Sequence, residues 1–137
     1  GDKRIINYLR YTAPGFVYSV GISPANAAAA LAAIEQMRAH PKRVAKMRSL
    51  AAAFLKLAQQ HGLNTGRSAG TPVIPIILGD ALLTMRVAQA MLQRGINVRP
   101  LLPPAVEENA ARLRFFVTSG HTQQHVQKSV AALTDYS

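Results

Sequence analysis

The chain has 137 residues, of which 49% are hydrophobic, so its length suits one domain with a substantial core. It contains no cysteine, which excludes disulfides, thiolate metal sites and cysteine nucleophiles. Sixteen Lys and Arg residues against six Asp and Glu give a formal net charge of +10, which favours anionic ligands or partners.

Residues 1–22 hold half of the eight Phe and Tyr residues, in two pieces separated by Pro14. The four are Tyr8, Tyr11, Phe16 and Tyr18. An aromatic segment of this kind is expected to lie against a larger surface. The charged start and the lack of any apolar run of about 20 residues favour a cytoplasmic chain without a signal peptide or membrane segment.

Two helices are predicted next, the first over residues 24–39 and the second from Pro41. Ser23 can cap the first helix and Pro24 suits its first turn. Its alanine-rich surface leaves room for a close contact outside this chain. In the second helix, Val44, Met47, Ala51, Phe54 and Ala58 form one buried stripe. Gly62 suits the end of that helix, and residues 64–70 form a polar loop.

An apolar strand over residues 71–78 follows, and Pro75 places it at a sheet edge or at a break in pairing. Asp80 can cap a helix that runs to residue 94 and ends at Gly95. The side chains predicted to face inward from this helix are Leu83, Val87, Ala90 and Met91.

The last elements are strands over residues 96–102 and 111–118 and a helix over residues 122–133. The helix buries Val126, Val130 and Leu133. From residue 23 onward the order is ααβαββα. This order predicts an α+β fold, a small and largely antiparallel sheet with helices packed on one face.

Two arginines share one face of the strand over residues 111–118. Because side chains alternate along a strand, Arg112, Arg114 and Phe116 lie on one face. The other face carries Leu113, Phe115 and Val117. The two arginines are expected either to bind an anionic ligand or merely to solvate an edge strand. The second alternative is supported by the usual exposure of Arg on protein surfaces.

The chain shows no complete catalytic or metal-binding pattern. His121 and His125 have helical spacing, but no third metal ligand follows nearby. Neither a glycine-rich phosphate loop nor a nucleophile elbow is present, and the adjacent acids Glu107 and Glu108 fit a solvated turn. We therefore expect no catalytic residue and no metal site in this chain.

Five segments occur in a fixed order along almost the whole chain. They are Tyr11-Thr-Ala-Pro-Gly-Phe-Val-Tyr-Ser-Val-Gly-Ile-Ser-Pro24, Pro72-Val-Ile-Pro-Ile-Ile-Leu-Gly-Asp80, the strand after Gly95, Pro103-Pro104 and Ala111-Arg-Leu-Arg114. In this order and spacing they resemble the C-terminal part of the α-oxoamine synthases. That family comprises pyridoxal-phosphate enzymes of the aspartate-aminotransferase fold, which condense an amino acid with an acyl-CoA.

The resemblance implies that residues 1–22 connect to a large catalytic domain and that residues 23–137 form the C-terminal small domain. It also implies a homodimer. The family lysine that binds pyridoxal phosphate would lie upstream of Gly1, so we expect this chain alone to be inactive and not to hold the cofactor. Ser19 and Val20 match the pair that reaches the cofactor phosphate of the other subunit.

For the substrates, the resemblance implies that Arg114 holds the amino-acid carboxylate. A planar guanidinium can pair with both carboxylate oxygens, which a lysine cannot copy. Ala105 matches a substrate-contacting position in a Pro-Pro-Thr loop. Val20 and Ala105 both lack the polar group that the family usually has there.

Two other functions stay open. The missing polar groups at Val20 and Ala105 favour a non-catalytic interaction module that kept the fold. A basic nucleic-acid-binding domain ranks third, because the densest basic cluster lies on a helix without interleaved aromatic residues. That cluster is Arg38, Lys42, Arg43, Lys46 and Arg48.

Overall fold

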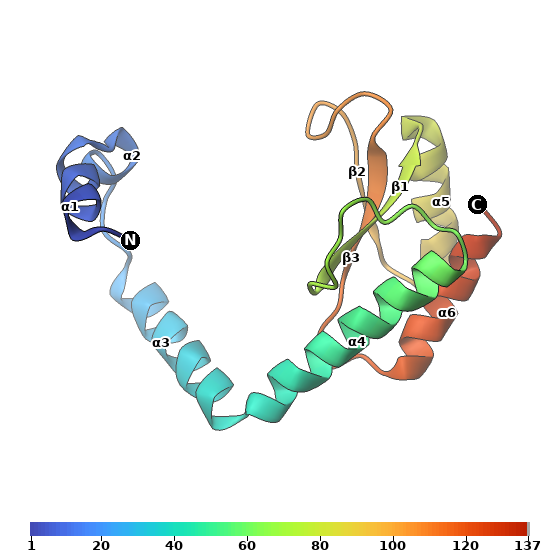
Figure 1. The fold of residues 1–137 in the computed structure, drawn as a ribbon, viewed down its shortest axis with the longest axis horizontal. Coiled ribbons are helices and arrows are strands. Elements are labelled where there is room, and N and C mark those ends of the chain that lie inside the picture. The colour runs from blue at the N-terminus through green and yellow to red at the C-terminus, as the bar shows by residue number, and fades with distance from the viewer. Residues whose placement is uncertain (137) are drawn as a thin grey trace. The chain divides into compact units, whose positions relative to one another are not determined.

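The computed structural model describes residues 1–136 of the chain (Figure 1). They form two compact units, one over residues 1–39 and one from His40 onward. The helix predicted over residues 24–39 therefore groups with the N-terminal segment in this chain. The predicted domain boundary between residues 22 and 23 concerns a longer protein and stays a prediction.

The first unit consists of the helices α1 (Lys3–Thr12), α2 (Pro14–Val17) and α3 (Pro24–Ala39). Only α3 was predicted. The start of α1 is stabilised by Asp2, whose Oδ1 accepts a hydrogen bond from the backbone N–H of Arg4 at 2.8 Å. Pro14 begins α2, where its missing N–H costs nothing.

No residue of α1, α2 or α3 is buried. On α3 the apolar side chains of Leu31, Ile34 and Met37 follow a spacing of three and are all exposed. The first unit thus has no core of its own, and its apolar side chains remain open to a further surface.

The second unit contains α4 (Pro41–Gln60), β1 (Val73–Gly79), α5 (Ala81–Gln93), β2 (Arg99–Leu101), β3 (Ala111–Phe116) and α6 (Gln123–Thr134). The three strands form one antiparallel sheet in the order β1-β3-β2. From α3 onward the element order is ααβαββα, so the predicted α+β fold is confirmed. Pro75 lies on β1, which is an edge strand as expected.

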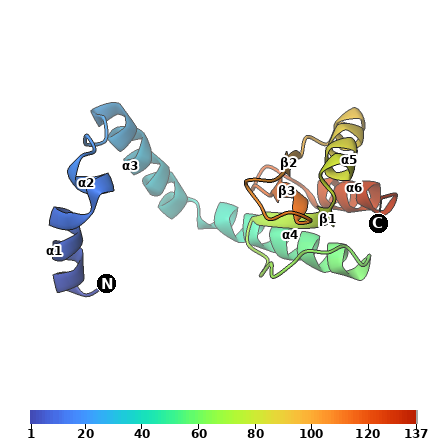
Figure 2. The same ribbon diagram turned by 90° about the horizontal axis from the view of Figure 1, so that it is seen from above.

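The core lies between one face of the sheet and the helices α4, α5 and α6. Its sheet side includes Ile74, Ile76, Leu113 and Phe115, which share one face by alternation. The helices contribute Phe54, Met91 and Leu133, among others. Helices α4 and α6 also lie side by side, as Figures 1 and 2 show. The opposite face of the sheet is the one turned away from α4, α5 and α6.

The prediction was wrong in one detail of α5 and one of β2. Leu83 was expected to face inward, but its side chain is 39% exposed and Thr84 is buried instead. Burial of Thr84 is tolerated because its hydroxyl donates a hydrogen bond to the backbone oxygen of Asp80 at 2.6 Å. Strand β2 is also shorter than predicted. The backbone N–H of Ile96 donates a hydrogen bond to the backbone oxygen of Met91 near the end of α5. This N–H is therefore not available for a bond within the sheet.

Candidate functional site

Arg112 and Arg114 project from the middle strand of the sheet, on the face turned away from α4, α5 and α6. Strand β3 pairs with β1 on one side and with β2 on the other. The edge-strand part of the solvation interpretation is therefore wrong, whereas the exposure of Arg114 agrees with its solvation part. A middle strand is held by ladder bonds on both sides, so it is a rigid base for a binding side chain.

Arg114 is exposed and has a defined direction. Its guanidinium lies over the ring of Phe116, 5.0 Å from the centroid. In the register of the sheet, Arg114 is opposite Pro75 on β1 and opposite Arg99 on β2. Arg99 was not singled out from the sequence, because its place beside Arg114 depends on the register between two strands.

Arg112 is half-buried, and its Nε donates a hydrogen bond to the backbone oxygen of Ala110 at 2.9 Å. It lines an open depression of about 630 Å³ together with Ala105, Arg67 and Glu107. The structure thus brings Ala105 together with Arg112, and Arg114 is not among the lining residues. The backbone N–H of Ala105 bonds to the oxygen of Leu102 at 3.0 Å, which fixes the turn of this loop.

Ser19 and Val20 lie in the first unit, between α2 and α3. The hydroxyl of Ser19 donates to the backbone oxygen of Phe16 at 3.1 Å. The side chain of Val20 is 95% exposed. Both residues are thus open to solvent in this chain, and they lie in a different compact unit from Arg114 and Ala105.

A pyridoxal-phosphate site needs a lysine whose amine is desolvated enough to lose its proton. Every lysine of the chain is exposed: Lys3, Lys42, Lys46, Lys56 and Lys128. The described residues therefore do not fit the cofactor's attachment, although Ser19 could contribute a hydroxyl to its phosphate.

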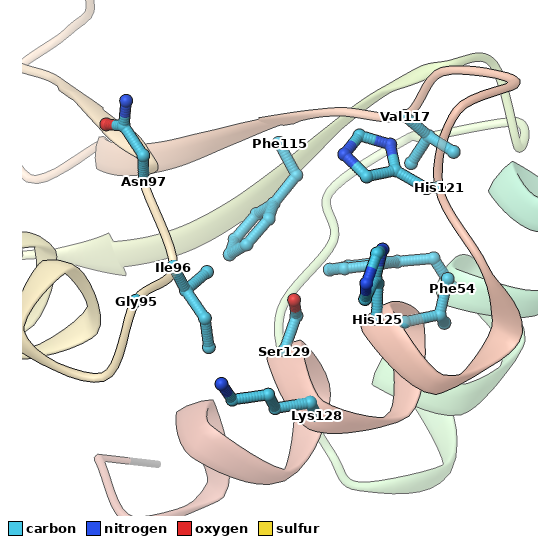
Figure 3. Close-up of a pocket in the computed structure, with 11 residues that line it drawn as sticks. Phe54, Gly95, Ile96, Asn97, Phe115, Val117, His121, His125, Lys128 and Ser129 are labelled. Carbon is cyan, nitrogen blue, oxygen red and sulfur yellow. The ribbon is translucent and has the colours of Figure 1, made fainter.

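A second cavity, of about 400 Å³, opens on the helix side of the sheet (Figure 3). Phe54 and Phe115 are among its apolar lining residues, with ring centroids 4.9 Å apart. His121, His125 and Lys128 lie around it. The Nδ1 atom of His121 accepts a hydrogen bond from the N–H of Thr118 at 2.9 Å, so that ring stabilises a turn.

The two histidines beside this cavity do not belong to a metal-ligand cluster. The rings of His121 and His125 lie edge to face, with centroids 6.0 Å apart. Across residues 1–136, no group of three or more potential metal ligands gathers. None of the helices described there combines the length and the apolar content that a bilayer crossing requires.

Comparison with known proteins places the chain in a family. The model of the family "Aminotransferase class I and II" matches residues 1–133. The 8-amino-7-oxononanoate synthases of Xanthomonas oryzae pv. oryzae (strain PXO99A) and Thioalkalivibrio sulfidiphilus (strain HL-EbGR7) are each 35% identical over 133 residues. The matches cover 97% of this chain but 33% and 34% of those proteins. The chain therefore spans about a third of the length of these relatives.

Solved structures show the same fold. The 8-amino-7-oxononanoate synthase of Francisella tularensis aligns with a TM-score of 0.77 at 22% identity, over 98% of this chain and 39% of that one. The serine palmitoyltransferase of S. paucimobilis with bound PLP–myriocin aligns with a TM-score of 0.79 at 19% identity. That alignment covers 95% of this chain and 33% of the other. These findings confirm the resemblance seen in the sequence. The chain belongs to the family of class I and II aminotransferases, and its similarity to 8-amino-7-oxononanoate synthases agrees with the resemblance to the α-oxoamine synthases.

Proposed function

We propose that the chain is the C-terminal part of a pyridoxal-phosphate-dependent acyl-CoA:amino-acid C-acyltransferase. In this role it supplies the arginine that binds the substrate carboxylate and part of the dimer contact. The observation that carries the proposal is the position of Arg114, exposed on the middle strand of an open sheet face. The names of the relatives make the 8-amino-7-oxononanoate synthase reaction the first to assay.

Arg114 suits carboxylate binding because its guanidinium is both exposed and directed. Stacking on Phe116 restricts its rotamers, so less conformational entropy is lost when a carboxylate binds. The planar fork can donate two parallel hydrogen bonds to one carboxylate. In this proposal the open sheet face is covered by the large catalytic domain, which would exclude water from the ion pair.

The other proposed contacts come from the loop and the first unit. Ala105 would face the substrate without offering a hydroxyl, and Ser19 and Val20 would reach the cofactor phosphate of the partner subunit. The exposed apolar side chains of α1 and α3 would form part of the dimer or interdomain contact. Pyridoxal phosphate supplies the electron sink for the reaction when bound. We place the complete enzyme in the cytoplasm.

Replacing Arg114 by Lys in the full-length protein tests the proposed function. The charge is kept but the fork is lost, so affinity for the amino acid should fall about 10- to 100-fold, as for the loss of a charge-assisted hydrogen bond. Amino-acid affinity is read from the cofactor's visible absorbance, and cofactor content should not change. Arg86→Lys, an exposed position on α5, is the matched control. Unchanged amino-acid affinity in Arg114→Lys would reject the assigned role.

A second candidate is a non-catalytic interaction module that retains the fold. Val20 and Ala105 favour it, because neither side chain carries a hydroxyl or an amide that could bind a ligand. Each lost neutral hydrogen bond is worth about 1 kcal/mol. Absorbance separates the two candidates. An enzyme should show a cofactor band that borohydride fixes covalently onto a lysine, whereas a degenerate module should stay colourless.

A further inference from the structure

Arg99 is the direct cross-strand neighbour of Arg114. The pairing of β2 with β3 places the two residues opposite each other. Residues opposite each other in an antiparallel pair lie on the same face, with Cβ atoms about 4.5–5.5 Å apart. Both side chains are exposed. Two guanidinium groups therefore start from neighbouring points on the open face of the sheet.

This arrangement is electrostatically unfavourable in the chain by itself. Like charges directly opposite each other destabilise a strand pair. The ion pairs found within residues 1–136 join Arg4 to Asp2 and Arg94 to Asp135, and neither involves Arg99 or Arg114. The repulsion between the two guanidinium groups is therefore not offset by a carboxylate of the described residues. An anion bound between them would remove the repulsion.

Arg112 lies on the same face but has different surroundings. Its Nε is already bonded to the oxygen of Ala110, and its cross-strand neighbours are the apolar residues Ile77 and Leu101. It also shares its depression with Glu107, an acid. Arg112 is thus held by its bond to the backbone and lies beside an acid. Arg99 and Arg114 are the two arginines on this face whose guanidinium groups are exposed and have no carboxylate partner among the described residues.

We propose that Arg99 and Arg114 together form a two-guanidinium clamp for a single carboxylate. A carboxylate offers about four lone-pair positions on two oxygens, enough to accept from both guanidinium groups. Arg114 is directed by Phe116, and Arg99 approaches the same anion from the edge strand β2. The proposal rests on the proposed function in one respect: the carboxylate is that of the amino-acid substrate.

The clamp is tested first on the 137-residue chain with acetate, which does not depend on any reaction. Acetate affinity is measured by NMR from the arginine Nε–H signals. Arg99→Gln and Arg114→Gln should each lower it by about two- to fivefold, the size of an exposed ion pair. The double variant should lose little more than either single variant, because the two side chains bind one ligand. Arg86→Gln controls for net charge, and methyl acetate controls for the ligand's charge.

Additive losses in the double variant would show two independent sites and overturn the clamp. A loss in Arg99→Gln no larger than in Arg86→Gln would also overturn it. These outcomes decide the clamp even if the full-length protein binds no pyridoxal phosphate, in which case only the proposed function fails.

The second measurement uses the full-length protein with its cofactor. Arg99→Gln should lower the affinities for alanine and aspartate by similar factors, about 10- to 100-fold, with cofactor content unchanged. Arg99→Lys keeps the charge and should recover part of the loss. A loss confined to aspartate would overturn the shared clamp, because Arg99 would then bind a side-chain carboxylate.

Discussion

Two neighbouring phenylalanines on β3 allow a matched test of which face of the sheet is covered. Phe115 is 8% exposed and packs on Phe54, whereas Phe116 is 54% exposed on the face of Arg114. Truncating a buried Phe to Ala typically costs about 3–5 kcal/mol of unfolding free energy. Phe116→Ala should lower the unfolding free energy by about 1 kcal/mol. The Phe116 side chain is only about half buried, so less buried surface is lost, together with one cation–π contact.

The assay is urea unfolding of the chain followed by circular dichroism, with the free energy taken from the midpoint and the slope. Because Phe115→Ala could unfold a marginal domain, Phe115→Leu and Phe116→Leu provide a milder pair with the same expected ranking. Equal costs at the two positions, or a larger cost at Phe116, would refute the assignment of faces. The assignment of Arg114 to the open face would then be refuted as well.

Two further predictions concern the turns and the first unit. Gly95 has a φ of 78° and an added Cβ there would meet only open space, so Gly95→Ala should cost about 1–2 kcal/mol from backbone conformation alone. Gly21→Ala, also in open space but without a positive φ, should change the unfolding free energy by less than about 0.5 kcal/mol. The exposed stripe on α3 should drive concentration-dependent self-association, which sedimentation can detect and Ile34→Glu should weaken more than Gln36→Glu. A chain that stays monomeric at high concentration would contradict this.

Much of the fold follows from local signals. Asp80 at the start of α5 and the glycines at the ends of α4 and α5 fix the helix bounds, and the structure shows the Asp80 cap as a 2.6 Å bond to the N–H of Leu83. Helix α1 was missed although Asp2 offered the same signal. The face of α5 was misplaced at Leu83, because the backbone bond that satisfies the Thr84 hydroxyl cannot be read from hydropathy.

The candidate site was predictable only where one strand determines it. Alternation along β3 was enough to place Arg114 and Phe116 on one face and Phe115 on the other. The pairing of Arg114 with Arg99 was not predictable, since it depends on the register across a long connection between β2 and β3. The depression that Ala105 and Arg112 both line likewise depends on how that connection folds back.

Each outer strand of the sheet has a proline near its centre, Pro75 in β1 and Pro100 in β2. Proline has no N–H to donate. Neither edge strand is therefore a good template for pairing with a fourth strand from another molecule. Edge-to-edge aggregation is therefore disfavoured even though the chain is rich in apolar residues. Any partner of this sheet is directed to its broad surface, where the arginines lie.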